Sequence, residues 1–514
     1  MRQTRLATLA VGLVALSAGC GFIGPDSAGP VTEPPPDASA PPTSPGGAPP
    51  PGEVVGVDRE WHEAKVHFDV SPVEVDGDLA VLRYDFTATP ADPSQDPWFS
   101  TLALSLGELG HPGTEGRGVR LFDTDAGLVH AVAHTSDGAP AALIDQVESE
   151  SGDEPLHGAA IAVFAAPESD SVDVLLPGYG AVTVPVVAAG DDFQDAVDQV
   201  GGVGEAETTK LRAFTRSYEA GSATSAEDDD VTVTLASDVL FASDEHTLSK
   251  KARGVVDRAA ASIKRQADAG DVQVVGHTDD VDTDSYNQML SERRAKAVAD
   301  RLRAGLGNDF TVTEEGRGES EPIVQDTTEE ARAANRRVEI QFRGHLVVEA
   351  DPESDVPETD APTAENDAVT ITTDDSRYTV EVESMVRRPG AIVGTLVAER
   401  TKGTSTDPAW FLPAYLDQIG GREFGALADV AGAHNLSLLG AEERVLPFDY
   451  VAEKSDGFVL RRLLGDEEVK PLDRGMSTLI TVVWPDTGQD TVTVDAPDRF
   501  RITDVPVTDA PTGD

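Results

Sequence analysis

The chain has 514 residues, of which 39% are hydrophobic, so it is too long for one core and suits three domains of ordinary size. Its formal net charge of −52 at pH 7 argues against nucleic acid as a partner, because phosphate groups would be repelled. Residues 231–345 carry 21 acidic against 16 basic side chains, so nearly all of the excess charge lies elsewhere. This near-neutral region can approach anionic polymers that the rest of the chain avoids, although an acid-rich proteome explains the charge equally well.

The start of the chain has the pattern of an export signal. Residues 1–5 are basic, residues 6–16 are apolar but too few to span a membrane, and Cys20 follows shortly after. The segment resembles a bacterial lipoprotein signal, in which residues 1–19 are removed and Cys20 becomes the lipidated first residue. Ser17 departs from the usual pattern, which has an aliphatic residue at the third position before the cysteine. Cys20 is the only cysteine, which excludes an intrachain disulfide.

Residues 20–53 form a tether that is rich in proline. Such a composition buries no core and favours an extended polyproline conformation, so about 30 residues reach about 90 Å at about 3.1 Å each. No later segment has the apolar length of a transmembrane helix. We therefore expect the folded domains to stand away from the membrane.

Residues 54–190 and 367–507 contain short alternating strands that are separated by Gly, Pro and Asp turns. This pattern is typical of all-β sandwich domains of immunoglobulin-like type. Both regions also share one order of features, in which an alternating V-x-V strand is followed by a proline and then by Val-Pro-Val. We expect the second region to be a copy of the first, with a superposition that pairs Pro177 with Pro497 and Pro185 with Pro506.

Acidic, turn-rich segments are expected to link these domains. Residues 191–230 pass from a short helical pattern into Ser-Ala-Glu-Asp-Asp-Asp, and residues 346–366 are acidic and contain proline. Residues 508–514 form a short tail. Between the two linkers, residues 231–345 remain as a central domain.

The central domain places an arginine where a helix should be apolar. At helical spacing, Leu290, Val298 and Leu302 form one stripe, and Arg294 lies within it. An arginine on a packing face must find an anion or stay hydrated. Asp279 is the obvious companion, because it follows a strand-like apolar run and so belongs to the loop where a strand passes to the helix. Such loops commonly carry binding residues.

Several short motifs follow one another along residues 231–342. They are Leu240-Phe241, Leu248-Ser249, Gly276-His277-Thr278-Asp279, Tyr286-Asn287, Leu290-Ser291-Glu292-Arg293-Arg294-Ala295, Gly316-Arg317-Gly318-Glu319 with Pro322, and Asn335-Arg336-Arg337-Val338-Glu339-Ile340. In this order they resemble the OmpA-type peptidoglycan-binding domain of OmpA proteins, Pal lipoproteins and flagellar stator proteins. The resemblance covers under a quarter of the chain.

The resemblance implies a fold and a ligand. The fold is a central α/β domain of βαβαβ type, made of two βαβ-like units. In the family, an aspartate after the second strand and an arginine fifteen residues later hold the diaminopimelate of the wall's stem peptide, and these positions are Asp279 and Arg294. Thr278, Asn287 and Arg337 are implied as supporting contacts. Strands are expected near 231–236, 271–276, 310–317 and 337–342, and helices near 247–266 and 285–304.

The chemistry of the Asp279 and Arg294 pair can also be argued without the family. The free end of a diaminopimelate side chain carries one ammonium and one carboxylate on the same carbon. Asp279 matches the ammonium, and Arg294 matches the carboxylate in bidentate geometry. A lysine-type stem peptide offers only the ammonium and would leave Arg294 without its partner, at a cost of about 1–3 kcal/mol. The alternative is an internal Asp279–Arg294 salt bridge that binds no ligand.

Sequence signatures of an enzyme are weak. His62 and His67 lie one position too far apart for a zinc-protease helix, and the residues around them alternate as in a strand. The chain has no G-x-S-x-G nucleophile elbow, and no cysteine remains for a thiol hydrolase. We therefore expect no enzymatic activity and no cofactor.

A calcium site is the strongest of the metal hypotheses. Asp280, Asp282 and Asp284 have the spacing of calcium ligands, but the loop lacks the glycine and the final glutamate of a dedicated site. The alternative is that Thr283 or Asp284 caps the helix that follows. We therefore expect no bound metal.

The sequence thus predicts a lipid-anchored envelope protein on the extracytoplasmic side of the cytoplasmic membrane, or of an outer membrane if the cell has one. It would bind diaminopimelate-type peptidoglycan non-covalently and link membrane to wall, with the β-domains as adaptor surfaces for other envelope proteins. Two alternatives stay open. One is a wall-remodelling hydrolase with an unrecognised site, and the other is a sensor or adaptor whose main ligand is another protein.

Overall fold

The computed structural model describes residues 52–61, 64–89, 118–147, 155–218, 221–348, 356–373, 375–403, 412, 432–455, 458–469 and 472–510. The described residues all belong to one compact unit, Pro45–Asp514. The predicted lipoprotein signal, Cys20 and the tether up to residue 51 lie outside the described residues, as does His62. Among the described helices, none combines the length and the apolar character that a membrane crossing requires.

The first flanking region consists of strands in two groups. One group comprises β1 (Val55–Trp61), β2 (Ala64–Val70), β3 (Val73–Asp76), β4 (Leu79–Thr89), β7 (Ala142–Val147) and β8 (Leu156–Ala165). The other comprises β5 (Arg120–Asp123), β6 (Leu128–Ala131), β9 (Ser171–Leu176) and β10 (Gly180–Ala188). Their apolar faces share one core, in which Phe68 and Tyr84 of the first group meet Val174 and Val184 of the second.

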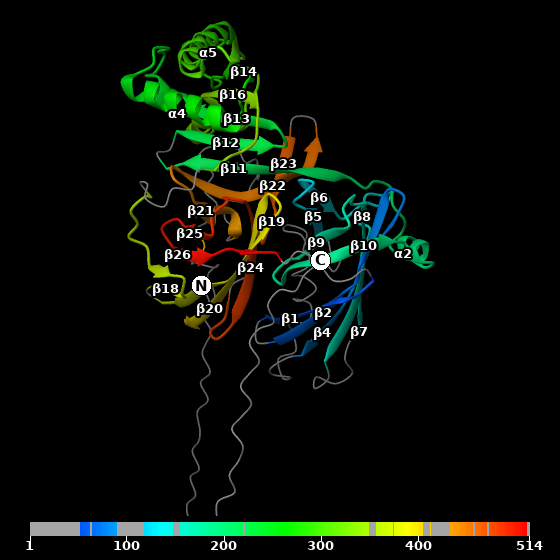
Figure 1. Cartoon of the computed structure of the whole chain (residues 1–514). Helices are drawn as coiled ribbons and strands as arrows, with labels where there is room; N and C mark the ends of the chain where they lie inside the picture. The colour runs from blue at the N-terminus through cyan, green and yellow to red at the C-terminus, as the bar shows by residue number, and fades with distance from the viewer. Residues whose placement is uncertain are drawn as a thin grey trace, which may run out of the picture. The chain divides into compact units, whose positions relative to one another are not determined.

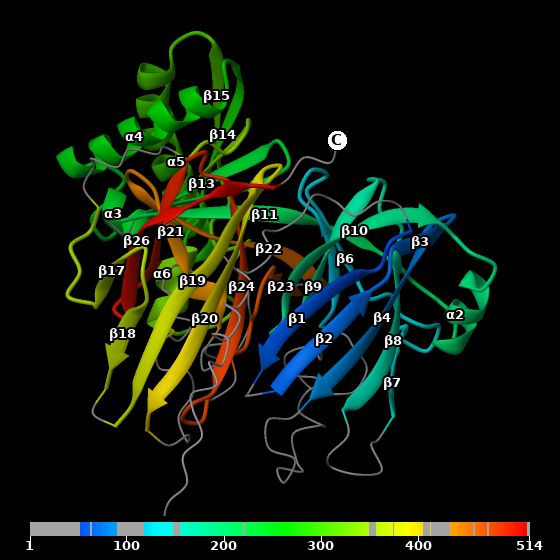
Figure 2. The same cartoon turned by 60° about the horizontal axis from the view of Figure 1, so that its bottom comes forward.

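The second flanking region is built in the same way (Figure 2). One group of strands comprises β18 (Val369–Thr372), β19 (Arg377–Arg388), β20 (Ala391–Lys402) and β24 (Ser477–Pro485). The other comprises β17 (Thr363–Glu365), β21 (Ser437–Leu439), β22 (Glu443–Ser455), β23 (Phe458–Leu463), β25 (Thr491–Ala496) and β26 (Phe500–Pro506), and a 3-10 turn covers Ala433–Asn435. Trp484 is fully buried in the shared core and donates a hydrogen bond from Nε1 to the carbonyl of Leu436, at 3.0 Å.

The strand pairings of the two flanking regions correspond. Pro177 follows β9 directly and Pro497 follows β25 directly, each in the turn of a hairpin. Pro185 and Pro506 each pair with the first residue of the preceding strand, although a bulge gives β26 one extra residue. The expected proline pairing is therefore present in the strand registers. Duplication as its origin, and the immunoglobulin-like type, stay predictions.

The two flanking regions also correspond where the chain leaves the β9–β10 and β25–β26 hairpins, because it then pairs in parallel with another strand of the same region. Val187 of β10 pairs in parallel with Glu74 of β3, and Thr508 of β27 (Thr508–Asp509) pairs in parallel with Val386 of β19. The last residues therefore add a strand to the second region, where the sequence predicts a tail. Part of the predicted linker at 346–366 is also structured, because β17 pairs with β26.

The central region has its main strands and helices close to the ranges that the sequence predicts. Strands β13 (Asp230–Ala236), β14 (Gly270–Gly276), β15 (Phe310–Gly316) and β16 (Arg337–Arg343) alternate with α4 (Lys250–Gln266) and α5 (Asp284–Leu306). The sheet order is β13, β16, β14, β15, in which β14 and β15 are parallel and β16 runs antiparallel to both of its neighbours. The helices pack on one face of this sheet, and buried residues of α4 and α5 share its core (Figure 1). Short helices α3 (Ser237–Leu240) and α6 (Glu329–Asn335) complete the region.

Within residues 191–230, which the sequence predicts as a linker, the described residues 191–218 and 221–230 are structured. They form α2 (Phe193–Gln199), β11 (Thr208–Ser217) and β12 (Ser222–Glu227). The acidic run that suggested a linker is the tight turn between β12 and β13, in which Asp228 has a φ of 52°. Aspartate tolerates this left-handed conformation better than most residues, so its acidic composition fits a turn as well as a linker.

Strand β11 belongs to three ladders at once. Thr208 pairs with His130 of β6, Thr215 pairs with Val445 of β22, and β12 pairs along the other edge of β11. The Arg212 side chain of β11 donates two hydrogen bonds to the buried carboxylate of Asp449 in β22, at 2.8 and 3.1 Å. The central sheet is therefore continuous with strands of both flanking regions. A fragment that began at residue 231 would lack β11 and β12 and would uncover the edge of β13.

Candidate functional site

Helix α5 lies directly across the ends of two strands. A Cβ atom on Gly276, the last residue of β14, would lie 2.3 Å from the carbonyl oxygen of Ser291. A Cβ atom on Gly316, the last residue of β15, would lie 2.3 Å from the backbone nitrogen of Glu292. Only glycine allows this close approach. It places the middle of α5, and with it Arg294, next to the loop that follows β14.

Arg294 is 5% exposed and incompletely paired. Its Nε donates to the carbonyl of Glu245 at 3.0 Å, and its guanidinium carbon lies 5.3 Å from the centroid of the Phe241 ring. The two terminal nitrogens donate to no described residue and are not fully buried. Burial lowers the pKa of Arg294, while the nearby carboxylates of Asp238, Asp244 and Asp279 act in the opposite direction. A buried guanidinium with two open donor groups has the geometry to accept a carboxylate through two hydrogen bonds.

Asp279 pairs with Arg336 rather than with Arg294. Its Oδ2 accepts a hydrogen bond from Nη1 of Arg336 at 2.7 Å, and its Oδ1 accepts one from the backbone of Val281 at 3.3 Å. The internal Asp279–Arg294 salt bridge, which the sequence leaves open as an alternative, is not among the ion pairs of the described residues. The Asp279 charge still contributes at Arg294, so the two side chains belong to one electrostatic site.

Arg336 is the residue that the sequence analysis missed. It also binds Asp238 and Glu329, and hydrogen bonds to Asp238, Asp279 and Glu329 raise its pKa. Arg336 ends α6 and Arg337 begins β16, so the two neighbouring arginines face different surroundings. The Asn-Arg-Arg motif does contain Arg336, but nothing in its spacing distinguishes the two.

Arg337 lies in a separate buried network. It donates to Glu339 at 2.7 Å and to the carbonyl of Glu321 at 3.2 Å. The ring of His277 is buried beside it, with Nε2 3.8 Å from Glu339. Burial, with help from the charge of Arg337, lowers the pKa of His277 to about 4, so this histidine is neutral at pH 7. The described hydrogen bonds thus place Arg337 apart from Asp279 and Arg294.

Asn287 and Thr278 shape the loop. The Asn287 side-chain amide donates to the carbonyls of Asp279 and Val281, at 3.3 and 2.7 Å, and to Glu319 at 2.5 Å. The Thr278 backbone donates to the carbonyl of Gly318, and its hydroxyl is buried with no partner among the described residues. Asn287 is therefore a positioning residue that holds the Asp279 loop against the start of α5.

The acidic loop caps a helix. The Thr283 hydroxyl accepts a hydrogen bond from the backbone of Tyr286 at 3.3 Å, which confirms the capping alternative. Asp280 is paired with Arg332 at 2.7 Å. Within the described ranges, no group of three or more His, Cys, Asp or Glu side chains is placed to hold a metal ion.

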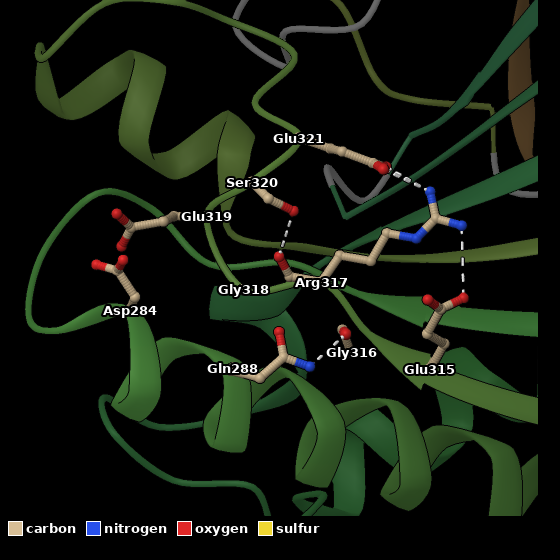
Figure 3. Close-up of a pocket in the computed structure, with 9 residues that line it drawn as sticks. All are labelled: Asp284, Gln288, Glu315, Gly316, Arg317, Gly318, Glu319, Ser320 and Glu321. Carbon is tan, nitrogen blue, oxygen red and sulfur yellow. Dashed lines mark hydrogen bonds and ion pairs between the residues drawn. The ribbon is translucent and has the colours of Figure 1, made fainter.

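A hollow of about 730 Å³ lies between the start of α5 and the loop after β15 (Figure 3). Its walls come from the first turns of α5, which carry Asp284 and Gln288, and from the loop after β15, which carries Glu319. Arg317 pairs with Glu315 and Glu321 at its other end. Glu319 also accepts a hydrogen bond from Asn287. The same Asn287 side chain therefore holds both a wall of the hollow and the Asp279 loop.

Comparisons with known proteins find matches to the central region. Residues 240–336 match the OmpA family. Over 112 residues, 22% of the chain, the sequence is 38% identical to outer membrane protein A of Bordetella avium, and over 94 residues, 17% of the chain, it is 46% identical to outer membrane porin F of Pseudomonas aeruginosa. The chain spans only 57% and 27% of these two relatives. A solved structure, the cell wall anchor of the T6SS from Pseudomonas aeruginosa, is 36% identical over 23% of the chain and 83% of its own, with a TM-score of 0.21.

Proposed function

We propose that this chain, which contains an OmpA-like domain, binds peptidoglycan non-covalently through the diaminopimelate of the stem peptide and links a membrane to the cell wall. The observation that supports the proposal is the open guanidinium of Arg294, on which the charge of the Asp279 carboxylate acts. The match of residues 240–336 to the OmpA family also supports it, because both residues lie within the matched segment.

The two charges suit the free end of diaminopimelate. Arg294 offers two donors to a carboxylate, and Asp279 offers a carboxylate oxygen to an ammonium group. Helix α5 positions Arg294, the loop after β14 positions Asp279, and Asn287 donates hydrogen bonds that hold this loop in place. Such preorganisation reduces the ordering cost of binding.

Sedimentation of the purified full chain with isolated walls tests the proposal. We expect binding to diaminopimelate-type walls, weaker binding as salt is added, and little binding to lysine-type walls, which lack the second carboxylate. The variant Asp279→Asn should weaken binding without a change in shape. Equal binding to both wall types would mean that the recognition site lies elsewhere.

The membrane link is proposed to be a lipid on Cys20, from the signal pattern at the start of the chain. The variant Cys20→Ser is expected to accumulate unprocessed or to be released from the membrane fraction, because neither lipid attachment nor lipoprotein cleavage can take place. Fractionation of cells and the mass of the mature N-terminus measure both effects. Membrane retention and processing like those of the native chain would rule the anchor out.

The flanking regions are proposed to be immunoglobulin-like sandwiches that arose by duplication and that offer adaptor surfaces to other envelope proteins. The corresponding positions of Pro177 and Pro497, and of Pro185 and Pro506, support the duplication. The continuous ladder through β11 supports a joint role, because it ties both regions to the wall-binding domain.

A further inference from the structure

We propose that the affinity of this site for the wall depends more on the charge of the diaminopimelate carboxylate than on that of the ammonium. Amidation of this carboxylate would therefore switch wall binding off. The inference rests on the proposed function and names a way in which the same site is regulated. It is based on a difference between the two residues without a ligand: Arg294 has open donor groups, whereas Asp279 is already paired with Arg336.

The two terminal nitrogens of Arg294 lack hydrogen-bond acceptors among the described residues. Its side chain is 5% exposed, its terminal nitrogens donate to no described residue, and its nearest neighbours are the Phe241 ring and a backbone carbonyl. The surrounding carboxylates act on it without a direct ion pair among the described residues. A ligand carboxylate would supply two charge-assisted hydrogen bonds at once, which is the strongest contact this site can add.

Asp279 has much less to gain. Its Oδ2 is already 2.7 Å from the guanidinium of Arg336, and its side chain is 13% exposed. A ligand ammonium would share this carboxylate with Arg336 and would meet that guanidinium as a like charge. The ammonium contact is therefore offset in part, whereas the carboxylate contact is not.

An amide cannot replace the carboxylate at Arg294. The amide oxygen carries no charge and can accept a hydrogen bond from one side of the guanidinium. The amide NH2 group is a donor, and it would face the other side of the guanidinium, which also has only donors. One terminal nitrogen of Arg294 would then stay desolvated without a partner, which is the costly outcome for a buried donor.

The net charge of the surroundings opposes this preference but is the weaker effect. Asp238 and Glu329 would favour a ligand that has lost its negative charge. Their side chains are 55% and 72% exposed, and both already pair with Arg336. Solvent and salt screen such charges, whereas a direct bidentate pair at a buried guanidinium is screened little.

Calorimetry of the full chain with four short stem peptides tests the inference. The peptides end in diaminopimelate, in diaminopimelate with an amidated side-chain carboxylate, in lysine, and in a residue that keeps the side-chain carboxylate but lacks the ammonium. We expect the unmodified peptide to bind best and the carboxylate-only peptide second. Amidation should weaken binding at least about tenfold and bring it near the lysine peptide.

Variants test whether Arg294 is the residue that distinguishes the free carboxylate from the amide. In Arg294→Gln, the ratio of the dissociation constants for amidated and free peptide should fall toward one, and Arg294→Lys should retain only part of it. Arg293→Gln makes the same charge change on the exposed face of α5 and should leave the ratio unchanged. Thermal melting of each variant separates a lost preference from a lost fold.

The outcomes distinguish this inference from the proposed function. Equal affinity of the native chain for the free and amidated peptides overturns the inference and leaves wall binding standing. A carboxylate-only peptide that binds no better than the lysine peptide also overturns it. If neither the free diaminopimelate peptide nor a diaminopimelate-type wall binds, the proposed function itself fails.

Discussion

Arg294→Ala is expected to lower the affinity of the full chain for diaminopimelate-type walls by about 100-fold, because it removes a bidentate, charge-assisted pair. The change also removes the stem that packs at Phe241 and the hydrogen bond to Glu245. Arg294→Lys should recover little, because an ammonium cannot form the planar fork. Quantitative sedimentation over a range of wall concentrations measures these differences.

The matched control for this prediction is Arg293→Ala. Arg293 is the exposed neighbour on the same helix and carries the same charge, so its loss should change wall affinity by no more than about twofold. Circular dichroism melts should show that both variants are folded at the assay temperature. Full wall binding by a folded Arg294→Ala protein would contradict the assigned site.

Asp449→Ala is expected to destabilise the chain by about 3–5 kcal/mol, the cost of breaking a buried ion pair from one side. The Asp449 side chain is fully buried, and it accepts hydrogen bonds from Arg212 of β11 and Arg461 of β23. Its loss would leave two largely buried guanidinium groups without this counter-charge. Urea denaturation followed by tryptophan fluorescence measures the effect.

Glu453→Ala is the control for Asp449→Ala, because Glu453 lies on the same strand and is exposed. It should change the free energy of unfolding by no more than about 0.5 kcal/mol. The residues proposed to bind the wall are far from Asp449 in sequence and belong to other elements, so Asp449→Ala should keep its wall affinity at temperatures where it is folded. An unfolding free energy like that of the native chain would mean that the buried network adds no net stability.

The central elements could be predicted from the sequence because their signals are local. The strand β14 carries the apolar residues Val272, Val274 and Val275. The apolar stripe of α5 extends through Leu290, Val298 and Leu302. The same stripe singled out Arg294, and the end of β14 singled out Asp279. Arg294 follows from helical periodicity and Asp279 from its place after an apolar run, while the roles of both were implied by the family resemblance.

The partner of Asp279 could not be predicted, because an ion pair forms through tertiary structure. Arg336 lies 57 residues from Asp279 and is adjacent to Arg337, which carries the same charge and faces another network. Strand β12 was missed for a different reason. Its sequence, Ser-Ala-Thr-Ser-Ala-Glu, has small and polar side chains and no strong alternation of apolar and polar residues. It is recognised as a strand only from its pairing with β11 and β13.

The place of β11 has a consequence for the order of folding during synthesis. Its ladder with β22 joins Arg212 to Asp449 across 237 residues, so this contact cannot form until most of the chain has been made. The sheet from β12 to β16 can close earlier, but it then presents one edge of β11 unpaired. An unpaired edge is a template for association with other chains, and long-range strand pairing is slow. The interval between completion of β16 and arrival of β22 is therefore when the nascent chain is most exposed to misassembly.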